Sequence, residues 1–304
     1  MFKQLPALIA ALLIAGPAAA QAADPNRIFT DSRLVVRDRF SDEIVGKGPD
    51  LVLIPGLASS RTTWKATAER LRGRYRLHLI QVAGFAGEPA RANAQGQVVI
   101  PTAEAIDAYL VEQKLTPATV VGHSLGGTMT LYLAEHHPQH LKKAMMVDTL
   151  PFLATLAAGP DATVEKVEPG AAKMRDAMLA SAKATTAESL APTMVAMSKL
   201  PERRHEIAVW GAASDRTAVA RAMYEDTTLD LRPGLSAITT PMTLVHPDYT
   251  PLGAPAGTVD ATYRAAYAPA KTVVVKEAPQ SAHFVMFDNP AAFDAELDAF
   301  LAQK

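Results

Sequence analysis

Short apolar runs alternate along the chain with longer segments in which apolar residues recur at helical spacing. The run Asp50–Ile54 stops at Pro55-Gly56, which is typical of a buried strand. The same pattern predicts further strands at 34–38, 43–46, 75–81, 118–121, 143–147, 242–246 and 272–276, and helices at 62–71, 103–113, 124–137 and 291–302. Strands that alternate with helices predict βαβ units, and therefore an α/β fold whose mostly parallel sheet has helices on both faces.

One long segment, residues 151–235, breaks this alternation because it contains no clear strand pattern. We expect it to be an insertion of several helices over one end of the sheet, which divides the core into residues 23–150 and 236–304. Its methionines are Met174, Met178, Met194, Met197 and Met223. They serve either ordinary helix packing or an adaptable apolar pocket, since methionine fills irregular gaps and repacks easily.

The first residues have the pattern of a secretory signal peptide, which we predict to span residues 1–22. Lys3 precedes the apolar run Ala7–Ala15, and Gly16-Pro17 breaks that run before small residues that fit a cleavage site. The run is too short to cross a bilayer as a helix. We therefore expect an exported chain, periplasmic or secreted, with no stable membrane span after cleavage; a short uncleaved anchor is the alternative.

Composition excludes several functional classes. The chain has 30 Lys+Arg against 31 Asp+Glu, so no basic excess favours nucleic-acid binding. The absence of cysteine excludes thiol catalysis, disulfides and cysteine-ligated metals. With 49% hydrophobic and 20% charged residues, the chain has the balance of an ordinary globular protein. The sequence predicts no particular oligomeric state.

The segment Gly122–Gly126 has the pattern G-x-S-x-G, with Ser124 at its centre, between a predicted strand and a predicted helix. In this context the glycines permit a sharp, strained turn that exposes the serine hydroxyl at the carboxyl end of the sheet. The helix N-terminus at Ser124 also favours developing negative charge. We therefore predict that Ser124 is a nucleophile; an inert serine in a tight turn is the alternative interpretation.

A serine hydroxyl needs a base, and His283 is the best candidate. It follows the last predicted strand, so its loop is expected at the same edge of the sheet as Ser124. His246, at the end of a strand, is the serious alternative, whereas the side chain of His123 should point away from the serine. The cluster His136, His137 and His140 has no obvious carboxylate partner, so we expect no zinc there.

The imidazole also needs an orienting acid, and two residues qualify. Asp248 follows the predicted strand 242–246, and Asp148 follows the predicted strand 143–147. We prefer Asp248, because the chain order Ser124, Asp248, His283 is the one expected for this type of sheet. Asp148 is the alternative acid, and its other interpretation is a structural carboxylate that fixes the loop leading into the insertion.

An acyl-transfer site needs hydrogen-bond donors for the oxyanion. The backbone N–H of Leu125, directly after the serine, is one candidate. The second is expected from the turn 55–58, where we nominate the N–H of Leu57 because Gly56 keeps that turn free of side-chain bulk.

These motifs, in this order and spacing, resemble those of the α/β-hydrolase superfamily. The resemblance rests on residues 51–56, 84–87, 122–126 and 283–284, and covers nearly all of the chain after the signal peptide. It implies an eight-stranded, mostly parallel sheet, a helical cap after the sixth strand, and a Ser-His-Asp hydrolase that uses no metal or organic cofactor. The implied substrate is a small or medium-sized apolar ester. Amides, peptides, lactones and thioesters are alternatives for the same residues, and a non-catalytic ligand-binding protein is the alternative from a different class.

Overall fold

The computed structural model describes residues 24–181 and 185–303, so the predicted signal peptide at 1–22 lies outside the described residues. Eight strands form one sheet in the order β1-β2-β4-β3-β5-β6-β7-β8. The strands are β1 (Arg33–Val36), β2 (Phe40–Gly46), β3 (Asp50–Ile54), β4 (Arg76–Val82), β5 (Ala118–His123), β6 (Leu141–Val147), β7 (Met242–Pro247) and β8 (Val273–Ala278). Strand β2 pairs antiparallel with β1 and β4, and the other neighbouring strands are parallel, which confirms the prediction of a mostly parallel sheet.

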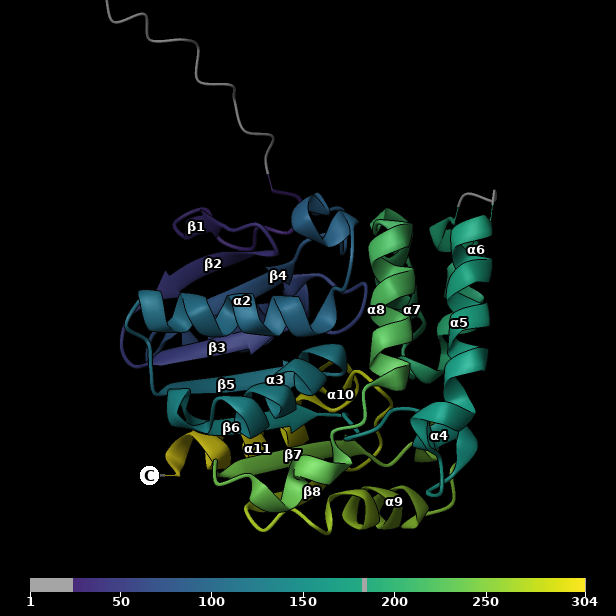
Figure 1. The fold of residues 1–304 in the computed structure, drawn as a ribbon. Coiled ribbons are helices and arrows are strands. Elements are labelled where there is room, and N and C mark those ends of the chain that lie inside the picture. Colours follow the sequence, from purple (N-terminus) through teal and green to yellow (C-terminus); the bar gives the residue numbers. More distant parts are fainter. Residues whose placement is uncertain (1–23, 182–184, 304) are drawn as a thin grey trace, which may run out of the picture.

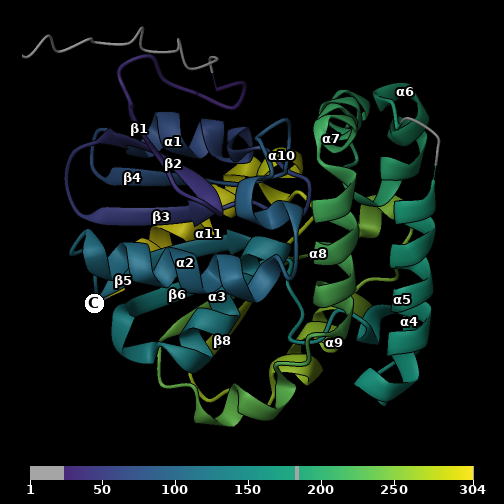
Figure 2. The same cartoon turned by 45° about the horizontal axis from the view of Figure 1, so that its top comes forward.

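Helices cover both faces of this sheet, as Figures 1 and 2 show. The helices outside the insertion are α1 (Lys65–Leu71), α2 (Val99–Glu112), α3 (Leu125–His136), α9 (Thr258–Tyr267), α10 (Val285–Asp288) and α11 (Pro290–Ala302). Short 3-10 helices are η1 (Arg61–Trp64), η2 (Arg91–Ala94), η3 (Pro138–His140), η4 (Ala191–Ala196), η5 (Arg232–Ala237) and η6 (Thr250–Leu252). None of the described helices is both long and apolar enough to cross a membrane.

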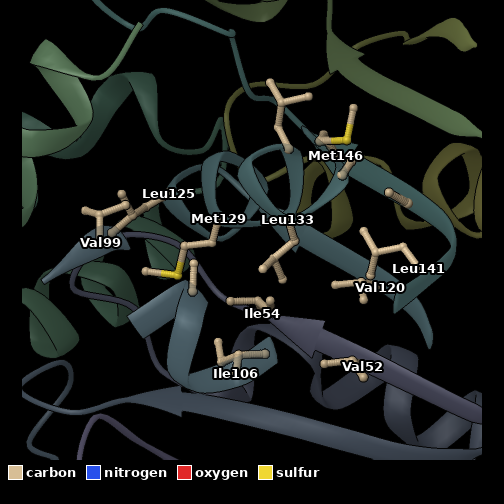
Figure 3. Packing of buried hydrophobic residues seen from close by; sticks show 14 of the residues in the cluster. Val52, Ile54, Val99, Ile106, Val120, Leu125, Met129, Leu133, Leu141 and Met146 are labelled. Carbon is tan, nitrogen blue, oxygen red and sulfur yellow. The ribbon is translucent and has the colours of Figure 1, made fainter. Parts of the chain in front are cut away.

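The central strands are apolar on both sides, and this is why both faces are covered. Along β3, Val52 and Ile54 belong to the cluster that packs against α2, α3 and α9, while Leu51 and Leu53 belong to the cluster with α1 and α11. Figure 3 shows part of the first cluster, where Met129 of α3 lies among the residues that pack on the sheet. The two clusters fix the strand ends and the loops that follow them.

The cap consists of the helices between β6 and β7: α4 (Thr155–Ala158), α5 (Val164–Ala180), α6 (Ala187–Leu190), α7 (Pro201–Ala213) and α8 (Arg216–Thr228). In Figure 1 these helices stand beside the end of the sheet to which the arrow of β3 points. Backbone hydrogen bonds join the cap to loops at that end. The N–H of Asp215 donates to Gly84 O (2.7 Å) after β4, and the N–H of Phe284 donates to Met197 O (2.8 Å) after β8. The cap therefore covers the carboxyl ends of the parallel strands.

Helix α9 is an element that the sequence analysis did not predict. Val259, Tyr263 and Tyr267 recur every four residues along it, and both tyrosines are buried against the sheet. The helix is only ten residues long and follows a loop rich in proline and glycine, and the sequence analysis assigned no element between 246 and 272. Its position matters because Tyr263 and Tyr267 lie beneath the loop that follows β6.

A buried ion cluster ties the first described residues to the sheet. The guanidinium of Arg61 is fully buried, 3.3 Å from Asp24 Oδ2 and 3.8 Å from Glu43 Oε2, and it donates a hydrogen bond to Ser41 Oγ. Burial lowers the pKa of Arg61, while the surrounding carboxylates oppose that shift. Glu43 also accepts hydrogen bonds from the backbone N–H groups of Ile28 (2.8 Å) and the next residue (2.7 Å). The segment 24–32 is thus attached to the sheet through Glu43 and Arg61.

Candidate active site

The serine turn, residues 122–126, joins β5 to α3 and holds Ser124 in a strained backbone conformation. Ser124 has φ 52° and ψ −121°, a region that residues with a side chain seldom occupy. Two backbone hydrogen bonds of 2.9 Å hold it there: Ser124 N–H donates to Val147 O, and Thr128 N–H donates to Ser124 O. The expected strand, turn and helix are therefore all in place around this serine.

The glycines of the serine turn are required by close backbone contacts. A Cβ on Gly122 would overlap the carbonyl oxygen of Gly126, and a Cβ on Gly126 would overlap the backbone oxygens of Ile54 and Pro55. A Cβ on Gly56 would lie 3.0 Å from Ser124 Cβ. The end of β3 and the serine turn thus pack directly against each other, which places the turn that contains Leu57 beside Ser124.

A cavity of about 290 Å³ lies between this turn and the cap. Its apolar wall includes Leu150, Leu153, Leu156, Ala196 and Val259. Its polar and titratable lining includes Ser124, Thr128, Asp148, Asp226, Tyr249, Tyr263 and His283. The cavity opens to solvent beside α4, because Leu156 lines it and is also 62% exposed. Ser124 and His283, which are 159 positions apart in the sequence, therefore share one enclosed space.

The imidazole of His283 is fixed by a buried carboxylate. Its Nδ1 lies 2.6 Å from Asp148 Oδ2, and its side chain is 17% exposed against 2% for Asp148. The hydroxyls of Tyr249 (2.8 Å) and Tyr263 also donate to this carboxylate. Burial alone would raise the pKa of Asp148, but the charge of His283 and the hydrogen bonds from the three side chains lower it below its ordinary value. An ionised Asp148 accepts a hydrogen bond from Nδ1–H, which leaves Nε2 as the basic nitrogen.

The preference for Asp248 as the acid beside His283 is wrong in the structure. Both oxygens of Asp248 accept hydrogen bonds from other groups: Gln280 N–H at 2.9 Å, Ser281 N–H at 3.3 Å, and the N–H and hydroxyl of Thr250 at 3.1 and 2.7 Å. Asp248 thus fixes the loop that carries His283, and the alternative acid, Asp148, makes the contact.

Two other histidines near the site have different surroundings. His246, the alternative base, is fully buried outside the cavity lining; its ring stacks on Tyr263 and its Nε2 lies 3.2 Å from Asp260 Oδ1. His123 is also fully buried, with Nε2 3.0 Å from the carbonyl oxygen of His283. Burial, followed by the charge of His283, lowers the pKa of His123 to about 3. His123 is therefore neutral and supports the backbone of His283.

The two backbone amides nominated for the oxyanion flank the serine. Leu125 is the first residue of α3, and Leu57 follows Gly56 in the turn after β3. Across 24–181 and 185–303, neither N–H has a hydrogen-bond partner. Both donors are therefore available for a ligand, and the N-terminus of α3 adds its dipole.

Two groups of side chains outside the cavity have the composition of a metal site. His137 and His140 lie with Asp107 of α2, whose carboxylate the sequence analysis did not anticipate; His140 Nδ1 is 2.8 Å from Asp107 Oδ1. The second group is His246, Asp260 and Glu277. In both groups histidine nitrogens already lie within hydrogen-bonding distance of carboxylates.

Asp226 is a cavity residue that sequence reasoning missed. It lies on α8 of the cap, inside a segment that has no recognisable motif, and only the folding of the cap onto the sheet brings it near the serine turn. No signal in the sequence could have distinguished it from the other acidic residues of the cap.

Comparisons with known proteins agree with this fold. The sequence model of the alpha/beta hydrolase fold matches residues 49–290. A pimeloyl-[acyl-carrier protein] methyl ester esterase of Vibrio vulnificus (strain YJ016) is 34% identical over 112 residues, 37% of this chain and 41% of that protein. The chain thus spans about two fifths of the length of the curated relatives it matches.

Two solved structures share the fold at low sequence identity. The enol-lactonase from Burkholderia xenovorans LB400 superimposes with a TM-score of 0.69 at 18% identity, covering 87% of this chain and 96% of that one. A thermophilic esterase from Thermogutta terrifontis has a TM-score of 0.68 at 17% identity, covering 86% and 93%.

Proposed function

Because this chain belongs to the alpha/beta hydrolase fold family, we propose that it is a serine hydrolase that cleaves carboxylic esters through an acyl-enzyme. One observation carries the proposal: Ser124, on its strained turn, lines the same cavity as an imidazole whose Nδ1 is held by Asp148. The methyl ester esterase among its relatives supports an ester as the substrate.

The proposed reaction uses these residues in the following steps. His283 Nε2 takes the proton of Ser124 Oγ as the oxygen attacks the ester carbonyl, and the N–H groups of Leu57 and Leu125 stabilise the oxyanion. The protonated His283 then donates to the leaving alcohol as the ester C–O bond breaks. Water attacks the acyl-enzyme with His283 again as base, which releases the acid and restores Ser124. Asp148 stabilises the imidazolium during both steps.

The cavity supports a small or medium-sized substrate with apolar parts. Its volume of about 290 Å³ is at the lower end of ordinary ligand pockets. Leucine, alanine and valine side chains form much of its wall, and among the residues that the structure describes neither lysine nor arginine lines it. We therefore place acyl chains of a few carbons, in neutral esters, among the preferred substrates.

The decisive experiment combines covalent labelling with turnover. A fluorophosphonate probe should modify Ser124 stoichiometrically, and Ser124→Ala should abolish both labelling and p-nitrophenyl ester hydrolysis while the fold persists. Ser189→Ala, which removes an exposed hydroxyl of the cap, is the matched control and should behave as wild type. If Ser124 is labelled but the enzyme hydrolyses amides, lactones or thioesters faster than esters, that substrate class replaces esters in the proposal. A folded chain that is neither labelled nor active would indicate a binding protein instead.

Export is the second part of the proposal, and the pattern in residues 1–22 supports it. Cell fractionation should place the protein outside the cytoplasm, with an N-terminus near Gln21 or Ala23. Leu12→Arg, which interrupts the apolar run, should retain the full-length precursor in the cytoplasm. A full-length wild-type chain in the cytoplasm would contradict the proposal.

A further inference from the structure

A second carboxyl group lies in the cavity besides that of Asp148. Asp226, on α8 of the cap, is only 7% exposed, and Thr128 Oγ1 donates to its Oδ1 at 2.8 Å. No described residue donates a hydrogen bond to its Oδ2. This oxygen is not fully buried, and because Asp226 lines the cavity, a ligand in the cavity can reach it. A largely desolvated acceptor thus faces the space that a substrate would fill.

In the part of the chain that the structure describes, no cationic side chain compensates Asp226 through a hydrogen bond or an ion pair. His283 favours its ionisation and Glu225 opposes it. Within 24–181 and 185–303, neither lysine nor arginine lines the cavity. Burial raises the pKa of Asp226 to about 6. A buried acceptor with one hydrogen bond is costly unless a ligand supplies a second donor.

We infer that Asp226 is a specificity-determining residue, which with Thr128 forms a polar subsite that accepts a hydrogen bond from a substrate hydroxyl and disfavours substrate carboxylates. This inference rests on the proposed function. Thr128 lies one helical turn after Ser124, about 6 Å along the helix axis at 1.5 Å per residue. The subsite is therefore close to the scissile carbonyl, and a hydroxyl two or three carbons along the acyl chain fits it best.

Three p-nitrophenyl esters with acyl chains of similar size test the subsite: butyrate, 3-hydroxybutyrate and the monoester of succinate. For the wild type we expect kcat/KM for 3-hydroxybutyrate to exceed that for butyrate by about tenfold, the value of one hydrogen bond to a buried charged group. We expect kcat/KM for the succinate monoester to fall at least tenfold below that for butyrate at pH 8, because two carboxylates would share a desolvated site.

Two variants separate hydroxyl recognition from charge repulsion. In Asp226→Leu the ratio of 3-hydroxybutyrate to butyrate should fall to about one or below. In the isosteric Asp226→Asn the discrimination against succinate should disappear, because the charge is removed while the shape is kept. Asp176→Asn, at a carboxylate on α5 that is 63% exposed, is the matched control and should keep both wild-type ratios.

The outcomes distinguish this inference from the proposed function. Wild-type substrate ratios in both Asp226 variants, with turnover that still depends on Ser124, would overturn the subsite alone. If Asp226→Leu does not fold, the test rests on Asp226→Asn, through its ratio of kcat/KM for the succinate monoester to kcat/KM for butyrate. If none of the three esters is hydrolysed and Ser124 is not labelled, the proposed function itself fails.

Discussion

His283 Nδ1 lies 2.6 Å from Asp148 Oδ2, on a carboxylate that also accepts hydrogen bonds from Tyr249 and Tyr263. Asp148 follows β6 directly, and its φ of 48° turns the chain sharply at the end of the strand. The acid that holds the imidazole is therefore itself held by two hydroxyl donors, from Tyr249 directly before η6 and from the buried Tyr263 of α9.

Exchange of the two candidate acids for asparagine should separate their roles. Asp148→Asn removes the charge beside His283 and favours the wrong imidazole tautomer, so we expect kcat to fall about 10³- to 10⁴-fold. Asp248→Asn weakens the hydrogen bonds to Gln280 and Ser281, so it should mainly lower the free energy of unfolding, by about 1–3 kcal/mol. Steady-state kinetics and chemical denaturation of both variants measure this. A larger loss of kcat in Asp248→Asn would contradict the assignment.

Asp288 joins the cap to the loop of His283, and its removal should weaken both. It accepts hydrogen bonds from Ala282 N–H (2.8 Å), from Lys199 N–H (3.0 Å) and from the hydroxyl of Ser198. We expect Asp288→Asn to lower stability by about 2 kcal/mol, as for hydrogen bonds to a buried charge, and to speed proteolysis of the cap. Asp298→Asn, at a carboxylate that is 48% exposed, is the control. Equal proteolysis rates in the two variants would show that Asp288 does not restrain the cap.

Gly56→Ala should impair turnover more than folding. The new Cβ would lie 3.0 Å from Ser124 Cβ and 3.2 Å from His123 Nδ1, so the turn that carries the Leu57 N–H has to shift. Loss of one oxyanion donor lowers kcat about 10²- to 10³-fold. Gly73→Ala meets no atom within 4 Å and should leave kcat unchanged. A normal kcat in Gly56→Ala would place the second oxyanion donor elsewhere.

Asp226 should make the free energy of unfolding depend on pH. Burial raises its pKa from 3.8 to about 6, so between these values the folded state holds a proton that the unfolded state releases. The free energy of unfolding therefore falls as pH rises from about 4 to 6 and stays lower above pH 6. The total loss is about 3 kcal/mol, since each pKa unit corresponds to about 1.36 kcal/mol. Asp226→Asn lacks this term. The gain in free energy of unfolding of Asp226→Asn over the wild type should be larger at pH 8 than at pH 4.5. An equal difference between the two proteins at both pH values would contradict the prediction.

Much of the sheet could be predicted from the sequence because its strands are apolar runs bounded by glycine and proline. Residues 50–54 and 118–121 match β3 and the start of β5, and Ser124 lies between β5 and α3 as expected. Helix α9 was missed although Val259, Tyr263 and Tyr267 recur at helical spacing, because the helix is only ten residues long and directly follows the proline- and glycine-rich loop 247–257.

The acid could not be identified because the criterion used for it did not discriminate. Asp148 and Asp248 both follow parallel strands, and both lie between Ser124 and His283 in chain order. The difference is set by tertiary contacts: backbone N–H groups of the His283 loop bind Asp248, while α9 supplies a hydroxyl to Asp148. Asp226 was equally out of reach, since its surroundings exist only after α8 packs over the serine turn.

The cluster around Arg61 limits how far the polypeptide can be shortened at its beginning. Asp24 supplies a counterion to a guanidinium that no water reaches, and it lies one residue after the later of the two predicted processing points. A peptidase that trimmed even two residues further would remove one of the two carboxylates paired with this buried guanidinium, which should lower the free energy of unfolding. The proposed maturation of the chain and its folding are therefore linked at a single carboxylate.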